Sequence, residues 1–146
     1  MITVDMLKKL EGTRLPGGSI EIAPHEDSIL QRALHASDAG DTAHPMWFII
    51  ISLRCMGIDV DELGEMAGQS VKDTLLFGNC EVLQNSPLRV GGRYWTDAEL
   101  TVVGSRTARD GSRLDSLEVR VRISDVDTAA VMGQVTSTYL YKRGES

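Results

Sequence analysis

Residues 42–53 read TAHPMWFIIISL, the most hydrophobic stretch in a chain of 146 residues. An Ala-His-Pro sequence stands directly before the apolar run, and two carboxylates, Asp38 and Asp41, lie just upstream. Three interpretations compete for such a run: a strand of a buried sheet, a membrane segment, or a buried helix whose first residues carry chemistry. Each interpretation makes different demands on the rest of the sequence.

The membrane interpretation fails on length. The unbroken apolar run covers only residues 46–51 and Arg54 follows it, whereas a membrane-spanning helix needs about 20 apolar residues. The N-terminal residues MITVDMLKKLEG lack the apolar region of a signal peptide. The sequence therefore predicts a cytoplasmic protein that has no membrane partner.

The choice between strand and helix also depends on length, because periodicity cannot separate two short apolar elements. Pro45 suits the first helical position, which makes His44 the cap residue and Gly57 the natural stop. Residues 45–56 would then form a helix that is apolar nearly all round, and other elements have to wrap it.

Composition predicts one globular domain that spans residues 1–146. Hydrophobic residues make up 42% and charged residues 25% of the chain, close to the averages of globular proteins. The formal net charge is −6, the pI is near 5.0, and the basic residues are scattered. Nucleic acid is therefore not expected as a partner.

The two cysteines and three histidines do not form the clustered pairs of a structural zinc site. We therefore expect no metal site and two reduced thiols, Cys55 and Cys80.

The C-terminal half predicts an antiparallel sheet. Apolar residues alternate with charged ones over residues 117–123, as in a strand with one solvated face. An Asp-Gly turn signal at residues 109–112 predicts a hairpin. The other expected elements are a short strand at 17–22, an amphipathic helix from Pro24 with Ile29, Leu30, Ala33 and Leu34 on one face, and strands at 80–84, 94–106 and 131–142.

A buried helix followed by long antiparallel strands resembles the hotdog fold, an α+β fold in which a sheet wraps a central helix. The motif Ala43-His44-Pro45-Met46 is similar to the AHGM segment that opens this helix in MaoC-like enoyl-thioester hydratases and dehydratases. Residues 76–82, LFGNCEV, and 87–92, PLRVGG, are similar to a later passage of the same family. The resemblance covers roughly residues 20–142 and implies a single MaoC-like hotdog domain.

The resemblance implies a mechanism in which an Asp and a His of a D-x-N-P-x-H loop hold a water and move its protons. Backbone N–H groups at the helix N-terminus polarise the thioester carbonyl. This chain lacks that loop motif, and His44 matches the AHGM segment instead. It therefore looks like the non-catalytic hotdog of a two-hotdog dehydratase or the accessory subunit of a heteromeric hydratase.

Candidate site residues follow from these motifs. Asp38, Asp41 and His44 are candidates for an atypical catalytic group, although capping alone favours such residues before a helix. The resemblance implies substrate contacts for a second set: Pro45, Met46, Trp47, Gly78 and Asn79. Cys80 could act as a nucleophile, but the sequence positions no base beside it and free cysteine is often simply buried.

Three functions remain open. The first is an accessory subunit of an enoyl-CoA hydratase or 3-hydroxyacyl-thioester dehydratase, with the Asp/His dyad on a partner chain. The second is a self-sufficient hotdog hydratase or thioesterase. The third is a non-enzymatic module that binds acyl thioesters. All three imply an acyl-CoA or acyl-carrier-protein ligand, a second hotdog chain as homo- or hetero-oligomer partner, and no cofactor.

Overall fold

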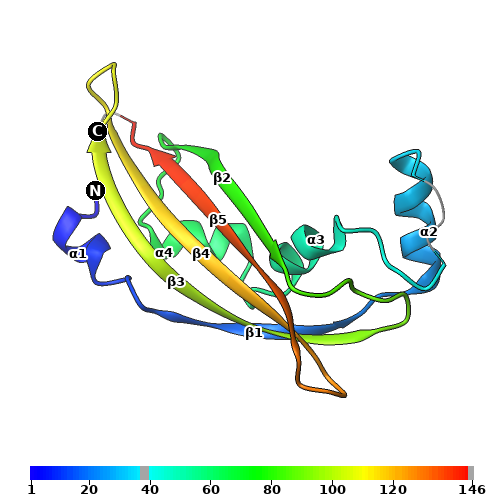
Figure 1. The fold of residues 1–146 in the computed structure, drawn as a ribbon. Coiled ribbons are helices and arrows are strands. Elements are labelled where there is room, and N and C mark those ends of the chain that lie inside the picture. The colour runs from blue at the N-terminus through cyan, green and yellow to red at the C-terminus, as the bar shows by residue number, and fades with distance from the viewer. Residues whose placement is uncertain (37–39, 145–146) are drawn as a thin grey trace.

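The computed structural model describes residues 1–36 and 40–144, and it has one antiparallel sheet of five strands in the order β1-β3-β4-β5-β2. Figure 1 shows the long strands curving around the helices α3 and α4, while α2 stands at one end, apart from the sheet. The strands are β1 (Arg14–Glu21), β2 (Thr74–Gln84), β3 (Arg93–Thr107), β4 (Arg113–Asp125) and β5 (Val131–Lys142). The helices are α1 (Val4–Lys8), α2 (Pro24–Ala33), α3 (Trp47–Arg54) and α4 (Val60–Met66).

The three central strands are those that the sequence pattern predicted. In β4 the apolar residues Leu117, Val119, Val121 and Ile123 are buried while the intervening residues reach solvent. β5 has the expected bounds, and the Asp-Gly turn closes the β3–β4 hairpin, where Ala108 N–H donates to the Ser112 carbonyl. Strand β2 begins six residues earlier than expected, at Thr74 rather than residue 80.

Helix α3 is the apolar run of residues 42–53, and it lies against the inner side of the sheet. Trp47, Phe48 and Ile51 are each at most 1% exposed and form the centre of the core. The helix starts later than expected, with Met46 rather than His44 as its N-cap. The reason is a tight first turn, in which the His44 and Pro45 carbonyls accept from the N–H groups three residues on.

The sheet does not wrap α3 completely. Met46 and Leu53 are 40% and 41% exposed, and Ile50 is half-buried. The sheet therefore wraps the helix as the sequence predicted, and one side of the helix stays uncovered in a single chain. An apolar side of this kind on a buried helix marks a surface that another molecule can cover.

The segment that follows α3, residues 55–57, is held against strand β1 by hydrogen bonds. The Thr96 hydroxyl on β3 donates to the Cys55 carbonyl and accepts from Gly18 N–H. Gly57, the predicted stop, has φ +95°, and a Cβ there would lie 2.4 Å from the Gly17 nitrogen. Only glycine fits this close passage. α3 itself ends at Arg54, two residues before the predicted end at residue 56, with Cys55 as its C-cap.

Two short helices were not predicted. In α4 the Asp59 and Glu62 side chains form a capping box, and α1 has a Thr3 cap. Among the described residues no helix is long and apolar enough to cross a membrane.

Ile51→Ala should lower the free energy of unfolding by about 2–5 kcal/mol, because it opens a cavity at the centre of the core. Leu53→Ala, two residues on but 41% exposed, should cost far less. Urea denaturation of the two variants measures the difference. Equal losses would contradict the assigned burial of α3.

Candidate functional site

The candidate site is the N-terminal end of α3, where the predicted residues His44 and Trp47 both contact Asp27 of α2. The His44 backbone N–H donates to Oδ1 of Asp27 at 3.1 Å, and His44 Nδ1 accepts from Met46 N–H, also at 3.1 Å. His44 is half-buried. Its side chain therefore acts as a local cap on the turn that leads into α3.

Asp27 of α2 is the residue that organises this end of the molecule. Its carboxylate is 3% exposed and accepts three hydrogen bonds: from His44 N–H, from Trp47 Nε1 at 2.9 Å and from Gln31 Nε2 at 2.7 Å. A buried carboxylate needs this degree of satisfaction. Asp27 thus ties α2 to α3 and holds the Trp47 indole in place.

The sequence analysis missed Asp27, because an acidic residue in the first turn of a helix has a ready explanation in the helix dipole. Asp27 and Gln31 are four residues apart and so share one face of the helix. That pairing of polar residues was the only signal for a buried polar contact.

The backbone donors at the start of α3 are already engaged. Met46 N–H bonds to the His44 ring, and the N–H groups of Trp47 and Phe48 bond to carbonyls of the tight turn. Polarising a thioester carbonyl at a helix N-terminus requires free donors. This end of α3 would have to open its own cap to provide one.

The other predicted site residues lie in different surroundings. Asp41 is exposed, with its carbonyl accepting from Val90 N–H at 2.8 Å, and Asp38 lies outside the described residues. Pro45 and Met46 are exposed, whereas Trp47 is 1% exposed and faces Asp27. The catalytic and substrate-binding roles of these residues stay predictions.

Gly78 and Asn79 lie on β2, an outermost strand of the sheet. The pairing of β2 with β5 shifts register between Phe77 and Asn79, so Gly78 lies at a bulge. Phe77, Val82 and Leu83 are 56%, 42% and 58% exposed along the same strand. The predicted substrate contacts on β2 thus lie on an apolar free edge.

Neither cysteine is paired in a disulfide. Burial raises the pKa of the Cys55 thiol, which disfavours the reactive thiolate. Cys80 is exposed and its sulfur accepts from the Ser137 hydroxyl at 3.7 Å. Within residues 1–36 and 40–144, no group of three or more His, Cys, Asp or Glu side chains could hold a metal ion.

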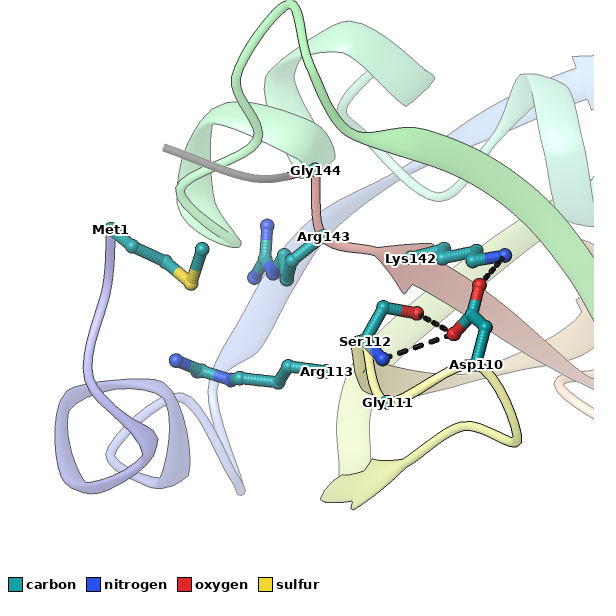
Figure 2. Close-up of a pocket in the computed structure, with 8 residues that line it drawn as sticks. All are labelled: Met1, Asp110, Gly111, Ser112, Arg113, Lys142, Arg143 and Gly144. Carbon is teal, nitrogen blue, oxygen red and sulfur yellow. Dashed lines mark hydrogen bonds and ion pairs between the residues drawn. The ribbon is translucent and has the colours of Figure 1, made fainter.

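A depression of about 650 Å³ lies at the other end of the sheet from this site. Met1, the β3–β4 hairpin at residues 110–113 and residues 142–144 line it. Figure 2 shows Lys142 and Ser112 directed at the Asp110 carboxylate in this depression. The Lys142–Asp110 distance is 2.6 Å. The basic side chains lining it have acidic partners, so we assign it no anion site.

A buried charged network, centred on Arg143 and Asp115, adjoins this depression. Arg143 is 3% exposed and contacts Asp115 at 2.8 Å and Asp73 at 2.9 Å. Burial alone would raise the pKa of Asp115, but hydrogen bonds from Arg113, Ser105 and Arg143 hold it below its ordinary value. Burial also opposes the lowered pKa of Asp73, which its backbone donors and Arg143 bring about.

Arg143→Met should lower stability at pH 7 by about 3–5 kcal/mol, because it removes the cation that Asp73 and Asp115 share and leaves Asp115 with Arg113 alone. Depressed carboxyl pKa values contribute stability above the unfolded value of about 3.9, and the contribution is lost as pH falls through the folded values. The gap between wild type and variant should therefore narrow below about pH 4. Urea denaturation of both proteins at pH 7 and pH 3 measures the difference in their free energies of unfolding. If that difference does not shrink at pH 3, the charged network is not its cause.

Asp27→Ala should cost about 1–3 kcal/mol for each buried donor that it leaves without an acceptor. Asp27→Asn should be much milder. Oδ1 of the amide can still accept from His44 and Trp47, and a flipped Gln31 can then present Oε1, which has no partner in the structure, to the new N–H₂ group. Thermal unfolding of the two variants tests this order, and the reverse order would contradict the hydrogen-bond assignment.

Comparison with solved structures identifies the fold. The ChsH1-ChsH2 complex from Mycobacterium tuberculosis matches with a TM-score of 0.71 at 12% identity, covering 98% of this chain and 90% of that chain. The HadBC (3R-hydroxyacyl-ACP dehydratase) complex of the same organism gives 0.66 at 12% identity, over 90% and 96% of the two chains. A MaoC-like dehydratase from Rhodospirillum rubrum gives 0.63 at 10% identity over the full length of both chains. Thioesterase structures match as well.

No protein-family model and no curated protein sequence matches this chain. The predicted fold is confirmed by the structural matches and by the helix-wrapped antiparallel sheet. The chain has an α+β hotdog fold, and its structural neighbours include MaoC-like dehydratases.

Proposed function

We propose that this chain is an accessory hotdog subunit of an enoyl-CoA hydratase or 3-hydroxyacyl-thioester dehydratase. In this assignment a partner chain supplies the Asp/His dyad, and the present chain contributes substrate contacts and assembly surface. The observation that carries the proposal is the closed start of α3, where Asp27 and His44 cap the backbone donors.

The closed start of α3 favours an accessory role for a chemical reason. Hydration adds water across a double bond conjugated to a thioester: the water oxygen bonds to the β-carbon, one proton leaves to a base, and the α-carbon takes a proton. A base needs an acceptor directed at the water. Nδ1 of His44 is engaged with Met46, and the Asp27 carboxylate already accepts three donors.

The exposed strand β2 supports a second hotdog chain as partner. An unpaired strand edge with apolar side chains is a surface that proteins cover by pairing. Two of the matching structures, HadBC and ChsH1-ChsH2, are themselves complexes. In the proposed complex the thioester lies between the subunits, near Met46 on α3 and Asn79 on β2.

A self-sufficient thioesterase or hydratase is the alternative, favoured by the thioesterases among the matching structures. Asp41 and His44 would then have to act directly, together with Asp38. Hydrolysis or hydration of acyl-CoA by the purified chain alone would establish this alternative. Acyl-CoA binding without turnover, in any combination of chains, would instead indicate a non-enzymatic module.

The test uses a complex reconstituted with a hotdog chain from the same genome that carries an intact D-x-N-P-x-H loop. His44→Ala should remove only a cap, worth about 0.5–2 kcal/mol of stability. Asp41→Asn should lower stability by less than that. Turnover of enoyl-CoA, followed by absorbance, should stay within about tenfold of wild type for both. Loss of a working acid or base lowers turnover by about 10²–10⁴.

The matched control replaces the Asp or the His of the partner's loop, which should abolish turnover of the same complex. A loss beyond about a hundredfold from either change in the present chain, with folding and assembly intact, would move the active site to Asp41 and His44. A complex that assembles but does not turn over enoyl-CoA would refute the proposed hydratase.

A further inference from the structure

The two outer edges of the sheet differ in what lies along them. Strand β2 forms one edge, and the other is formed by β1 and, beyond the end of β1, by the second half of β3. β1 pairs only with residues 93–99 of β3, whereas β3 continues to Thr107. Residues 100–107 therefore have β4 on one side and, among the described residues, no strand on the other.

Two side chains take the place of a strand beside Val103. The Val103 N–H donates to Oε1 of Glu11 at 3.0 Å, and the Val103 carbonyl accepts from Nζ of Lys8. An antiparallel neighbour would offer the same pair of groups to a residue of the edge, one acceptor and one donor. A real strand would also present a second row of backbone groups on its far side. Lys8 and Glu11 satisfy Val103 without creating that row.

The chain that joins α1 to β1 closes the next position of the same edge. Gly12 N–H donates to the Leu100 carbonyl at 2.7 Å, and Leu100 N–H donates to the Thr13 carbonyl at 2.9 Å. Leu7 of α1 is fully buried and anchors this N-terminal segment in the core. Figure 1 shows α1 beside the part of β3 that extends beyond β1.

β1 itself is a poor template for a further strand. Pro16 has no N–H to offer, and the register of β1 with β3 shifts between Leu15 and Gly18. Gly17 N–H, inside this irregularity, donates to the Met56 carbonyl at 3.2 Å, so the segment after α3 occupies that part of the edge. Proline, a bulge and a covering segment are all devices that protect sheet edges.

Closing one edge limits how copies of this chain can associate. β2, at the other edge, exposes Phe77, Val82 and Leu83 and is open to pairing. If the β1–β3 edge were equally open, β2 of one copy could pair with β3 of the next, and such head-to-tail contacts can continue into a filament. One closed edge removes that route, because strand pairing must then use β2 and ends once β2 is paired.

We propose that residues 8–17 act as an edge guard, which excludes a further strand from β3 and so prevents this chain from polymerising head to tail. Lys8 and Glu11 are the residues of the guard that hold the place of a strand at Val103. Charged side chains suit this role, because an incoming strand would have to displace both groups from hydrogen bonds that its own backbone only replaces. The role is independent of the ligand and of the reaction proposed above.

The test compares Lys8→Ala/Glu11→Ala with the conservative pair Lys8→Arg/Glu11→Gln, which keeps a donor and an acceptor at the same positions. The matched control is Lys9→Ala/Glu65→Ala. It also removes one exposed charge of each sign, but from positions other than the two that bond Val103. Circular dichroism and urea midpoints establish that each protein is folded. Sedimentation velocity over micromolar concentrations and thioflavin T fluorescence then measure polymerisation.

Lys8→Ala/Glu11→Ala should form polymers that bind thioflavin T and are larger than any wild-type species, in a proportion that rises with concentration. The conservative pair and the control should keep the wild-type size distribution. Amide hydrogen exchange gives a second readout: Glu11→Ala should speed exchange of the Val103 N–H by about three- to tenfold, and Glu11→Gln by much less. If the double alanine variant does not fold, Glu11→Ala alone is measured in its place.

A folded alanine variant that keeps the wild-type size distribution would overturn the proposal. Equal polymerisation of the control or of the conservative pair would do the same, because neither removes the groups that bond Val103. Aggregates that do not bind thioflavin T would also contradict the edge guard, since they do not arise by addition of strands. Unchanged exchange of the Val103 N–H in Glu11→Ala would show that Glu11 does not protect this edge.

Discussion

The buried carboxylate of Asp27 makes the hydrogen bonds on which the candidate site at the start of α3 depends. This carboxylate accepts hydrogen bonds from the His44 backbone N–H, the Trp47 indole and the Gln31 carboxamide. Burying a carboxylate is costly unless it is hydrogen-bonded, so loss of any of its three donors would destabilise this end of the molecule. Two consequences follow together: α3 begins with its donors capped, and α2 is held with its polar side inward and with Ile29, of its predicted apolar face, 63% exposed. The closed start of α3 and the orientation of α2 thus have one physical origin.

Much of the fold could be predicted from sequence because its signals are local. Alternation along Leu117–Ile123 and the Asp-Gly turn specify β4 and its hairpin without reference to the rest of the chain. The apolar run predicts α3 through its length, because periodicity alone does not separate a short buried helix from a buried strand. The exact start of α3 could not be predicted, because Pro45 is compatible both with the first helical position and with the tight turn that precedes it.

The site was less predictable because its decisive contact is tertiary. Nothing in the sequence near Asp27 indicates that its partners are Trp47 and the His44 backbone, 20 and 17 residues away. The hydrophobic positions of α2 were recognised from sequence. Which side of α2 faces the rest of the molecule depends on the contacts of Asp27 with His44 and Trp47, which are distant in sequence. The short helix α4 was missed for a related reason: its capping box is a local signal, yet seven residues give too little periodicity to read.

The free edge of β2 also bears on how the protein must be made. An edge strand that exposes Phe77, Val82 and Leu83 offers its unpaired backbone to any other extended chain, including nascent copies of itself. A chain with such an edge is exposed to misassembly as long as the edge stays uncovered. If the proposed two-subunit complex forms, the ratio in which the two chains are synthesised would control how much of this one stays in solution. Simultaneous production of both chains would then keep this one from aggregating.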